Sequence, residues 1–227
     1  MRDEISICLP KGDAMKPLAE YLEKLRFPVK EYHSKNRTYR PEVTDLGERV
    51  RAKIMAEKDV AIQVAVENYD IGFCGTDWIE EHTVRYRAAK LHVFRQFGLN
   101  KKNLYACTGL NGDFQSVEDL QTAQDFVTIV SEYPNLAENF AIQNKLKKFK
   151  IFSAWGSVEG YPPEHADVVL LAAYDKDMLE GMGLHIVSCE LESELSMIVN
   201  RKRFADKDLS PVLNFFSDTE IINDRNS

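Results

Sequence analysis

The sequence lacks the spacings from which metal and redox sites are usually built. Its four cysteines, Cys8, Cys74, Cys107 and Cys189, are far apart, and no two of them form a Cys-x-x-Cys pair. Its five histidines show no His-x-x-x-His spacing. We therefore expect no protein-built metal site and four reduced thiols, because free cysteine is usually buried in the core.

The sequence also lacks a basic excess and a long apolar run. There are 29 Lys+Arg against 36 Asp+Glu, a net charge of −7, so nucleic acid and anionic membranes are not expected partners. No segment approaches the roughly 20 apolar residues of a spanning helix. The start, with Arg2, Asp3 and Glu4, is too acidic for a signal peptide. A cytoplasmic location is the expectation.

Alternating strand-like and helix-like segments fill the chain instead. Apolar runs suited to buried strands alternate with apolar residues spaced three and four apart, which predicts an α/β protein with parallel strands. No Pro/Gly/Ser linker separates independent domains, so two lobes joined by short crossovers are predicted, one of residues 1–97 plus 190–227 and one of residues 98–189. The expected strands are 5–9, 69–74, 104–107, 126–130, 150–154, 168–171, 184–187 and 195–199.

Residues that follow the strands form the candidate site, because ligands of open α/β sheets bind outside the carboxyl ends of the strands. Several are Gly, Ser, Thr or Lys directly before a helix, where backbone N–H groups can bind an anion. Two interpretations stay open: Gly12 and Gly75 bind a ligand or serve tight turns, and Thr76 and Ser157 bind a ligand or cap helices. These segments are 10–13, 75–77, 131–133, 155–157 and 172–177.

Known nucleotide-binding motifs do not account for these residues. The sequence has no Walker loop. Gly181-Met182-Gly183 is not a dinucleotide motif, because Ile186 stands where the third glycine should be and a strand is expected to follow.

The strand-end segments resemble the ATP phosphoribosyltransferases of histidine biosynthesis. They occur in the family order over roughly residues 5–203, and the Asp-Ile-Gly-Phe-x-Gly-x-Asp and Glu-Tyr-Pro-Asn-Leu blocks are the most specific. The matching segments are 9–12, 69–77, 130–136, 156–159 with 166–167, 183–184 and 198–201.

The resemblance implies a two-lobed fold like the type II periplasmic binding proteins, with the ligand in the cleft between the lobes. It implies phosphoribosyl transfer from phosphoribosyl pyrophosphate to N1 of ATP, with Mg²⁺. The chain is similar in length to the short form, so a separate regulatory subunit or a homo-oligomer is the implied partner.

The family pattern also implies roles for individual residues. Glu132 and Glu159 would be the acids near the reacting base or metal. Lys11 and Gly12 would bind anionic substrate groups. The implied ligand-lining residues are Gly75, Thr76, Asp77, Ser131, Tyr133, Pro134 and Ser157.

One family element is replaced. In the family a Ser/Thr-Gly-Thr-Thr loop holds the 5′-phosphate, and here Tyr174, Asp175, Lys176, Asp177 and Met178 stand in that place. Two like charges about 4 Å apart repel by about 4 kcal/mol at an effective dielectric near 20. Weak or absent binding of phosphoribosyl pyrophosphate is therefore predicted, and Asp175 has the alternative role of capping the next helix.

A rival function follows from the same loop. A non-catalytic small-ligand-binding or regulatory paralogue would keep the fold, and acidic residues in the loop favour a cationic or amine-bearing ligand. An enzyme with a different donor is a third interpretation.

Overall fold

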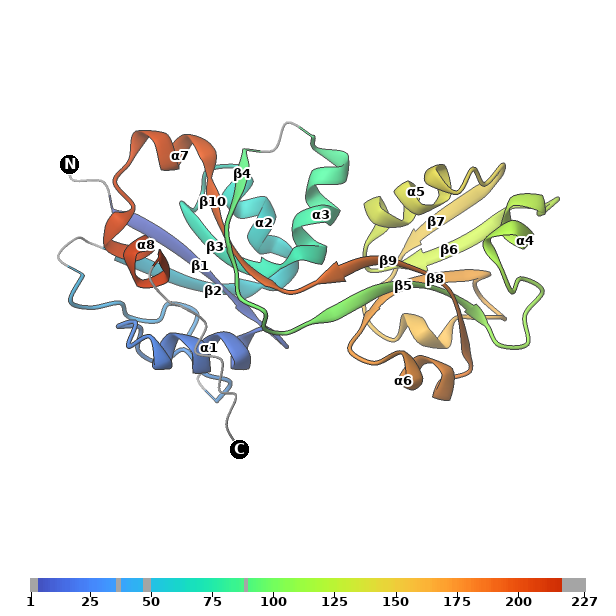
Figure 1. Cartoon of the computed structure of the whole chain (residues 1–227), viewed down its shortest axis with the longest axis horizontal. Helices are drawn as coiled ribbons and strands as arrows, with labels where there is room; N and C mark the ends of the chain where they lie inside the picture. The colour runs from blue at the N-terminus through green and yellow to red at the C-terminus, as the bar shows by residue number, and fades with distance from the viewer. Residues whose placement is uncertain (1–3, 36–37, 47–49, 88–89, 218–227) are drawn as a thin grey trace. The chain divides into compact units, whose positions relative to one another are not determined.

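The computed structural model describes residues 4–35, 38–46, 50–87 and 90–217, and these residues form two compact units (Figure 1). Unit 1 contains the described residues within Met1–Gly75, Lys90–Asn100 and Leu195–Ser227. Unit 2 contains those within Thr76–Ala89 and Lys101–Glu194. Each unit has its own mixed sheet and helices, so the α/β class is confirmed.

Unit 1 is built on a sheet with strand order β2-β1-β3-β10-β4. Strands β1, β2 and β3 are parallel, and β10 runs antiparallel to β3 and β4. The elements of unit 1 are β1 (Ile5–Lys11), α1 (Met15–Lys24), β2 (Val50–Ala56), α2 (Glu57–Ala65), β3 (Ile71–Gly75), β4 (Leu91–Gln96), β10 (Leu195–Asn200), α7 (Arg201–Asp206) and α8 (Ser210–Ser217).

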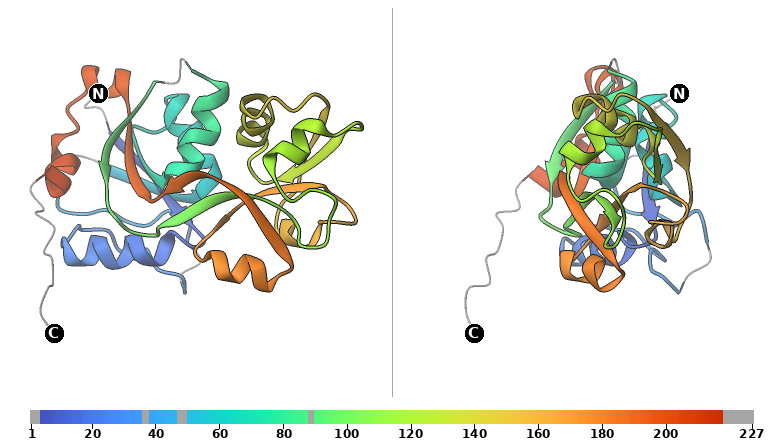
Figure 2. Two further views of the ribbon diagram at one scale, coloured as in Figure 1. Left: turned by 45° about the vertical axis from the view of Figure 1, so that its right-hand side comes forward. Right: turned by 90° about the vertical axis from the view of Figure 1, so that its right-hand side faces the viewer.

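The sheet of unit 1 is covered on both faces, which explains its nearly continuous apolar strands. Alternate residues of β1 and β3, such as Ile7 and Phe73, pack against α1 and α8. Between them, Cys8 and Gly72 face α2, where Val60 and Val64 cover them. In Figures 1 and 2, α1 and α8 accordingly lie on one side of this sheet and α2 on the other.

Unit 2 has the strand order β7-β6-β8-β5-β9. Strands β6, β7 and β8 are parallel, and β5 is antiparallel to β8 and β9. The elements of unit 2 are α3 (Thr76–Arg85), β5 (Lys102–Gly109), α4 (Val117–Thr122), β6 (Val127–Ser131), α5 (Pro134–Gln143), β7 (Phe149–Ser153), the 3₁₀ helix η1 (Val158–Gly160), β8 (Val168–Ala173), α6 (Lys176–Gly181) and β9 (Leu184–Ser193).

Two apolar layers sandwich the sheet of unit 2. On one face Ile129 and Leu170 pack with Phe140 of α5, and on the other Val130 and Val169 pack with Leu179 of α6. Strands β6 and β8 are covered on both faces, which explains why their β-branched runs correctly predicted buried strands. Ser116 caps α4 by accepting the Asp119 N–H, as the Ser-x-x-Asp pattern indicates.

The structure differs from the sequence-based elements at the sheet edges. The edge strands β2 and β4 were not expected, and β9 runs on to Ser193 instead of ending at 187. Residues 188–190, expected as a crossover, therefore lie inside a strand. Helix α3, assigned from sequence to the first lobe, packs on α5 and β9 and belongs to unit 2.

None of the described helices combines the length and apolarity needed to cross a membrane.

Candidate active site at the strand ends

A pocket of about 560 Å³ lies at the carboxyl ends of the parallel strands of unit 1. The sequence-predicted residues Lys11 and Gly12 belong to its wall, directly after β1. The other lining residues are Met15, Ser34, Thr38, Tyr39 and Ile54. The pocket thus combines one lysine, the hydroxyl side chains Ser34 and Thr38, and the exposed phenol ring of Tyr39.

The pocket lies where α1 begins, and that helix start carries no acidic cap. Its N-cap residue is Ala14, no side chain caps it, and its first turn has no acidic residue. Gly12 has a φ of +89°, which favours glycine, and a Cβ there would meet nothing within 4 Å. Lys11 and the positive end of the α1 dipole therefore favour an anionic group at this place.

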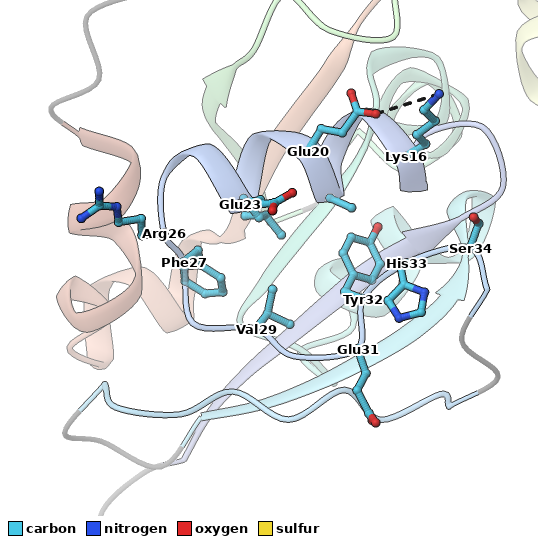
Figure 3. Close-up of a pocket in the computed structure, with 12 residues that line it drawn as sticks. Lys16, Glu20, Glu23, Arg26, Phe27, Val29, Glu31, Tyr32, His33 and Ser34 are labelled. Carbon is cyan, nitrogen blue, oxygen red and sulfur yellow. Dashed lines mark ion pairs between the residues drawn. The ribbon is translucent and has the colours of Figure 1, made fainter.

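A second pocket of about 560 Å³ adjoins the first and shares Ser34 with it (Figure 3). It lies between α1 and residues 26–34, with Tyr32 on its floor, and Lys16 and Glu20 pair at its rim at 3.9 Å. Its walls mix three glutamates with a lysine and an arginine. This mixture favours neither sign of ligand, so we leave it outside the candidate site.

Gly75, at the end of β3, does not offer its N–H to a ligand. That N–H donates to Glu57 Oε1 at 2.7 Å, from the first residue of α2. Beside it, the Tyr32 hydroxyl donates to the Pro10 carbonyl at 2.7 Å. Burial, and then the negative charge of Glu57, raise the pKa of Tyr32 far above its ordinary value. A carboxylate of the protein thus holds a position expected to serve a substrate anion.

Ser131 and Asp77 are buried, and their side chains are hydrogen-bonded within unit 2. Ser131 donates to the Leu170 carbonyl at 2.6 Å and accepts the Tyr133 N–H at 2.8 Å, which holds the end of β6. Asp77 is 0% exposed, and its carboxylate binds Tyr133, Lys102 and Ser193. Thr76 donates its N–H and its hydroxyl to the Glu194 carbonyl.

The N-terminus of α5 is occupied as well. Glu81 of α3 accepts the N–H of Asn135 at 3.0 Å and that of Leu136 at 2.9 Å, one on each carboxylate oxygen. Pro134 has no N–H to give. Burial raises the pKa of Glu81, against the effect of these N–H donors. The helix start expected to face a ligand is therefore capped by a residue that sequence reasoning missed, 54 positions away in the chain.

Glu132 binds the backbone of the loop after β7, next to Ser157. Glu132 Oε1 accepts the Gly156 N–H at 2.5 Å, and Ser157 follows with a left-handed φ of 54° and no capping bond to η1. Glu159 lies within η1. The parallel strands β6 and β7 bring Glu132 and Gly156 to one sheet edge, as expected, and Glu132 again takes up a backbone donor there.

The loop after β8 carries Asp175 and Asp177 at the start of α6. Asp175 is the N-cap of α6, and its side chain accepts the Asp177 N–H at 2.9 Å, so its predicted capping role is confirmed. Tyr174 is 55% exposed and Met178 46% exposed. The described residues hold no group of three or more His, Cys, Asp or Glu side chains suited to a metal ion.

Comparisons with known proteins give the family. The model of the ATP phosphoribosyltransferase family matches residues 56–217. The ATP phosphoribosyltransferases of Prosthecochloris aestuarii and Chlorobium chlorochromatii are 25% and 24% identical over 202 residues. The match covers 89% of this chain but 65% of each relative, so the chain spans less than two thirds of their length.

Solved structures agree on the fold. The ATP phosphoribosyl transferase (HisG:HisZ) complex from Thermotoga maritima contains a chain with a TM-score of 0.74 at 19% identity, covering 93% of this chain and 94% of that one. A Candida albicans protein with the generic periplasmic binding protein fold has a TM-score of 0.58 at 11% identity, with coverage of 94% and 68%. The chain therefore belongs to the ATP phosphoribosyltransferase family, with a fold similar to the periplasmic binding proteins.

Proposed function

We propose that this protein binds an anionic, nucleotide-type ligand through the Lys11–Gly12 pocket of unit 1 and carries out the phosphoribosyl transfer of its family weakly at most. The main support is a difference between the strand ends in whether a protein carboxylate already binds the backbone N–H groups. The pocket after β1 has a lysine and a helix start that no side chain caps. The loops after β6, β7 and β8 have donors bonded to Glu81, Glu132 and Asp175.

The electrostatics support this division. A phosphate approaching the loop at 174–178 would meet Asp175 and Asp177, and the capping N–H it needs is already used. A phosphate at the β1 pocket would meet Lys11 and the start of α1. Under this proposal Lys11 and Gly12 bind the anion, and Glu132 shapes the Gly156 loop rather than acting on a substrate.

The magnesium of the family fits only as an ion that arrives with the substrate. Mg²⁺ is commonly bound by one or two carboxylates together with substrate phosphates. It would supply charge neutralisation to a leaving pyrophosphate. A regulatory subunit or a homo-oligomer, and a cytoplasmic location, belong to the same proposal through the family.

Calorimetric titration with phosphoribosyl pyrophosphate and with ATP, each with Mg²⁺, tests the proposal. ATP should bind more tightly than phosphoribosyl pyrophosphate, and Lys11→Met should weaken ATP binding about tenfold, which corresponds to about 1.4 kcal/mol. The control is Lys16→Met, which removes a lysine of α1 that lines the second pocket. It should leave ATP binding unchanged. Equal losses in both variants would contradict the Lys11 site.

A loop replacement tests the weak transfer. Replacing Tyr174–Met178 by Ser-Thr-Gly-Thr-Thr removes both aspartates and supplies hydroxyls, so it should improve phosphoribosyl pyrophosphate binding at least tenfold. Micromolar binding by the unaltered protein, with pyrophosphate release in the presence of ATP, would overturn the proposal and show a working transferase. Binding of amine-bearing metabolites alone would favour the non-catalytic paralogue instead.

A further inference from the structure

A single buried carboxylate collects three donors in unit 2. Asp77 is the second residue of α3 and is 0% exposed. Its Oδ2 accepts from Lys102 Nζ at 2.8 Å and from the Tyr133 hydroxyl at 2.6 Å, and its Oδ1 accepts from Ser193 Oγ at 2.8 Å. The Asp77 N–H also donates to Ser193 Oγ at 3.0 Å. Both carboxylate oxygens are therefore in use.

The partners of Asp77 come from the places where the chain enters and leaves unit 2. The chain crosses between the two units four times, and three of these crossings, the connecting segments, follow Gly75, Asn100 and Glu194. Asp77, Lys102 and Ser193 each lie within two residues of one of these passages. Thr76 adds two bonds to the Glu194 carbonyl, at 3.0 Å from its N–H and 3.1 Å from its hydroxyl. The unit 2 ends of three connecting segments are thus bonded to one another.

Tyr133 extends this cluster to the candidate site. It directly follows Glu132 at the end of β6, and its ring stacks on Trp78 of α3 with centroids 4.3 Å apart and planes at 30°. Asp77 holds the hydroxyl and Trp78 holds the ring. Tyr133 is buried and contacts α3 through both its hydroxyl and its ring. Helix α3 therefore holds the backbone next to Glu132 in place.

Burial makes the cluster behave as one piece. The Lys102 side chain is 9% exposed and that of Asp77 is not exposed, so losing either partner would leave a buried charge unpaired. The three connecting segments therefore cannot move independently without breaking a charge-assisted bond.

We propose that Asp77 is a positioning residue that locks the three connecting segments and Tyr133 into one rigid junction of unit 2. The junction gives the connecting segments a common end that moves with β6 and α3. It does not depend on which ligand the protein binds. Loss of the carboxylate should therefore release four segments together: the ends of the three connecting segments and the turn that contains Tyr133.

Asp70 of unit 1 offers a matched control. It is also buried, at 3% exposed, and its Oδ2 accepts from Lys207 Nζ at 2.8 Å and from the Ser6 N–H and hydroxyl at 2.7 and 2.8 Å. It lies directly before β3, and its partners Ser6 and Lys207 are outside the connecting segments. Asp70→Asn therefore removes a comparable buried charge without touching the junction.

Hydrogen exchange of the full chain, read by mass spectrometry, compares Asp77→Asn with Asp70→Asn. Asp77→Asn should raise exchange at 76–78, 101–103, 131–134 and 192–194 together, whereas Asp70→Asn should raise it near Ser6 and Lys207 and leave those four segments protected. The same pattern in both variants, or a change confined to 76–78, would overturn the junction.

Trp78 fluorescence supplies a second measurement. The chain has two tryptophans, so Trp155→Phe leaves Trp78 as the sole reporter. In that background Asp77→Asn should shift the emission to the red as the Tyr133 stack loosens, and Asp70→Asn should not. An unchanged emission in Asp77→Asn would count against the positioning of Tyr133.

A milder variant keeps the test decisive if Asp77→Asn does not fold. Ser193→Ala removes one neutral partner from the carboxylate. It should raise exchange at 131–134 as well as at 192–194, although Ser193 does not contact Tyr133 in the hydrogen bonds of this cluster. Exchange that rises at 192–194 alone would show independent segments and overturn the proposal.

Discussion

Carboxylates that accept backbone N–H groups are the recurring residue-scale feature of this protein. Glu57, Glu132 and Asp175 each bind a donor next to a strand end, and Glu81 binds two at the start of α5. A carboxylate at such a donor mimics the anion that the position would otherwise bind. An external phosphate would have to displace this carboxylate to bind at such a place.

Glu67 has the opposite role, as the shared partner of surface cations. It accepts from Lys202 at 3.2 Å and Lys90 at 3.4 Å, and Arg203 lies 3.8 Å away. The hydrogen bond from Lys202, and then that from Lys90, hold the pKa of Glu67 below its ordinary value of 4.5. The folded protein therefore carries fewer protons at this site near pH 4 than the unfolded chain does.

The resulting stabilisation should be present above pH 4.5 and be lost as the pH falls through the lower folded pKa. Glu67→Gln should lower the thermal midpoint at pH 7, and the difference from the parent protein should shrink towards pH 3 and at high salt. Glu20→Gln, in an exposed helix pair with Lys16, should change the midpoint little at any pH. A Glu67 effect that is constant from pH 7 to pH 3 would contradict this reading.

At the scale of elements, the contact between β3 and α2 depends on one glycine. A Cβ on Gly72 would lie 2.6 Å from Val60 Cγ1, 2.8 Å from Val64 Cγ2 and 2.9 Å from Cys8 Sγ. These atoms are buried side chains of a helix and a neighbouring strand, so they have little room to move. The glycine lets α2 pack directly on the sheet.

Gly72→Ala should therefore destabilise the fold by about 1–3 kcal/mol through overpacking, measured by urea unfolding. Gly181→Ala, at the last position of α6, is the matched control, because a Cβ there meets nothing within 4 Å. It should be neutral or stabilise by up to about 1 kcal/mol, since alanine favours the helix. Similar losses in both variants would show that packing against α2 is not the cause.

The edge strands show where the local sequence pattern fails to predict the structure. In strand β2 the exposed residues Arg51 and Lys53 alternate with the buried residues Ala52 and Ile54. This alternation is typical of an edge strand, yet the charged residues within it gave no strong strand signal. Only its parallel pairing with β1 shows it to be part of the sheet.

At the scale of the whole molecule, two separate cores protect the thiols. Cys8 and Cys74 are buried in unit 1 and Cys107 in unit 2, whereas Cys189 on β9 is exposed. Burial raises the pKa of Cys107 to about 12 and that of Cys8 further. The thiolate is the reactive form of cysteine. Burial therefore slows the reaction of these thiols in two ways, because it blocks access of the reagent and keeps the thiol protonated.

A thiol reagent should therefore label one cysteine quickly in the native protein and four in denaturant. Cys189→Ser should abolish the fast reaction and leave the total in denaturant at three. Mass spectrometry of the labelled peptides identifies the site. Rapid native labelling of Cys8, Cys74 or Cys107 would mean that the core of that unit opens more readily than its burial indicates.

Local order along the chain was enough to determine the α/β class and the family. Strand runs such as 126–130, the helix faces between them and the blocks around Gly75 and Glu132 are properties of neighbouring residues, which a sequence displays directly. The capping role of Asp175 was equally local, since its partner is two positions away. The same holds for the return of Leu195–Asn200 to the first sheet, which followed from the family order.

Only the tertiary structure decided which candidate groups are available. Glu57 reaches Gly75 across 18 positions, Glu81 reaches Asn135 across 54 and Asp77 reaches Ser193 across 116. It also decided that α3 belongs with unit 2, because that depends on Glu81 and Trp78 meeting α5 and Tyr133. A hydrogen-bond donor at a strand end looks the same in the sequence whether it is open or occupied. Its state depends on burial and on partners that folding brings from distant parts of the chain.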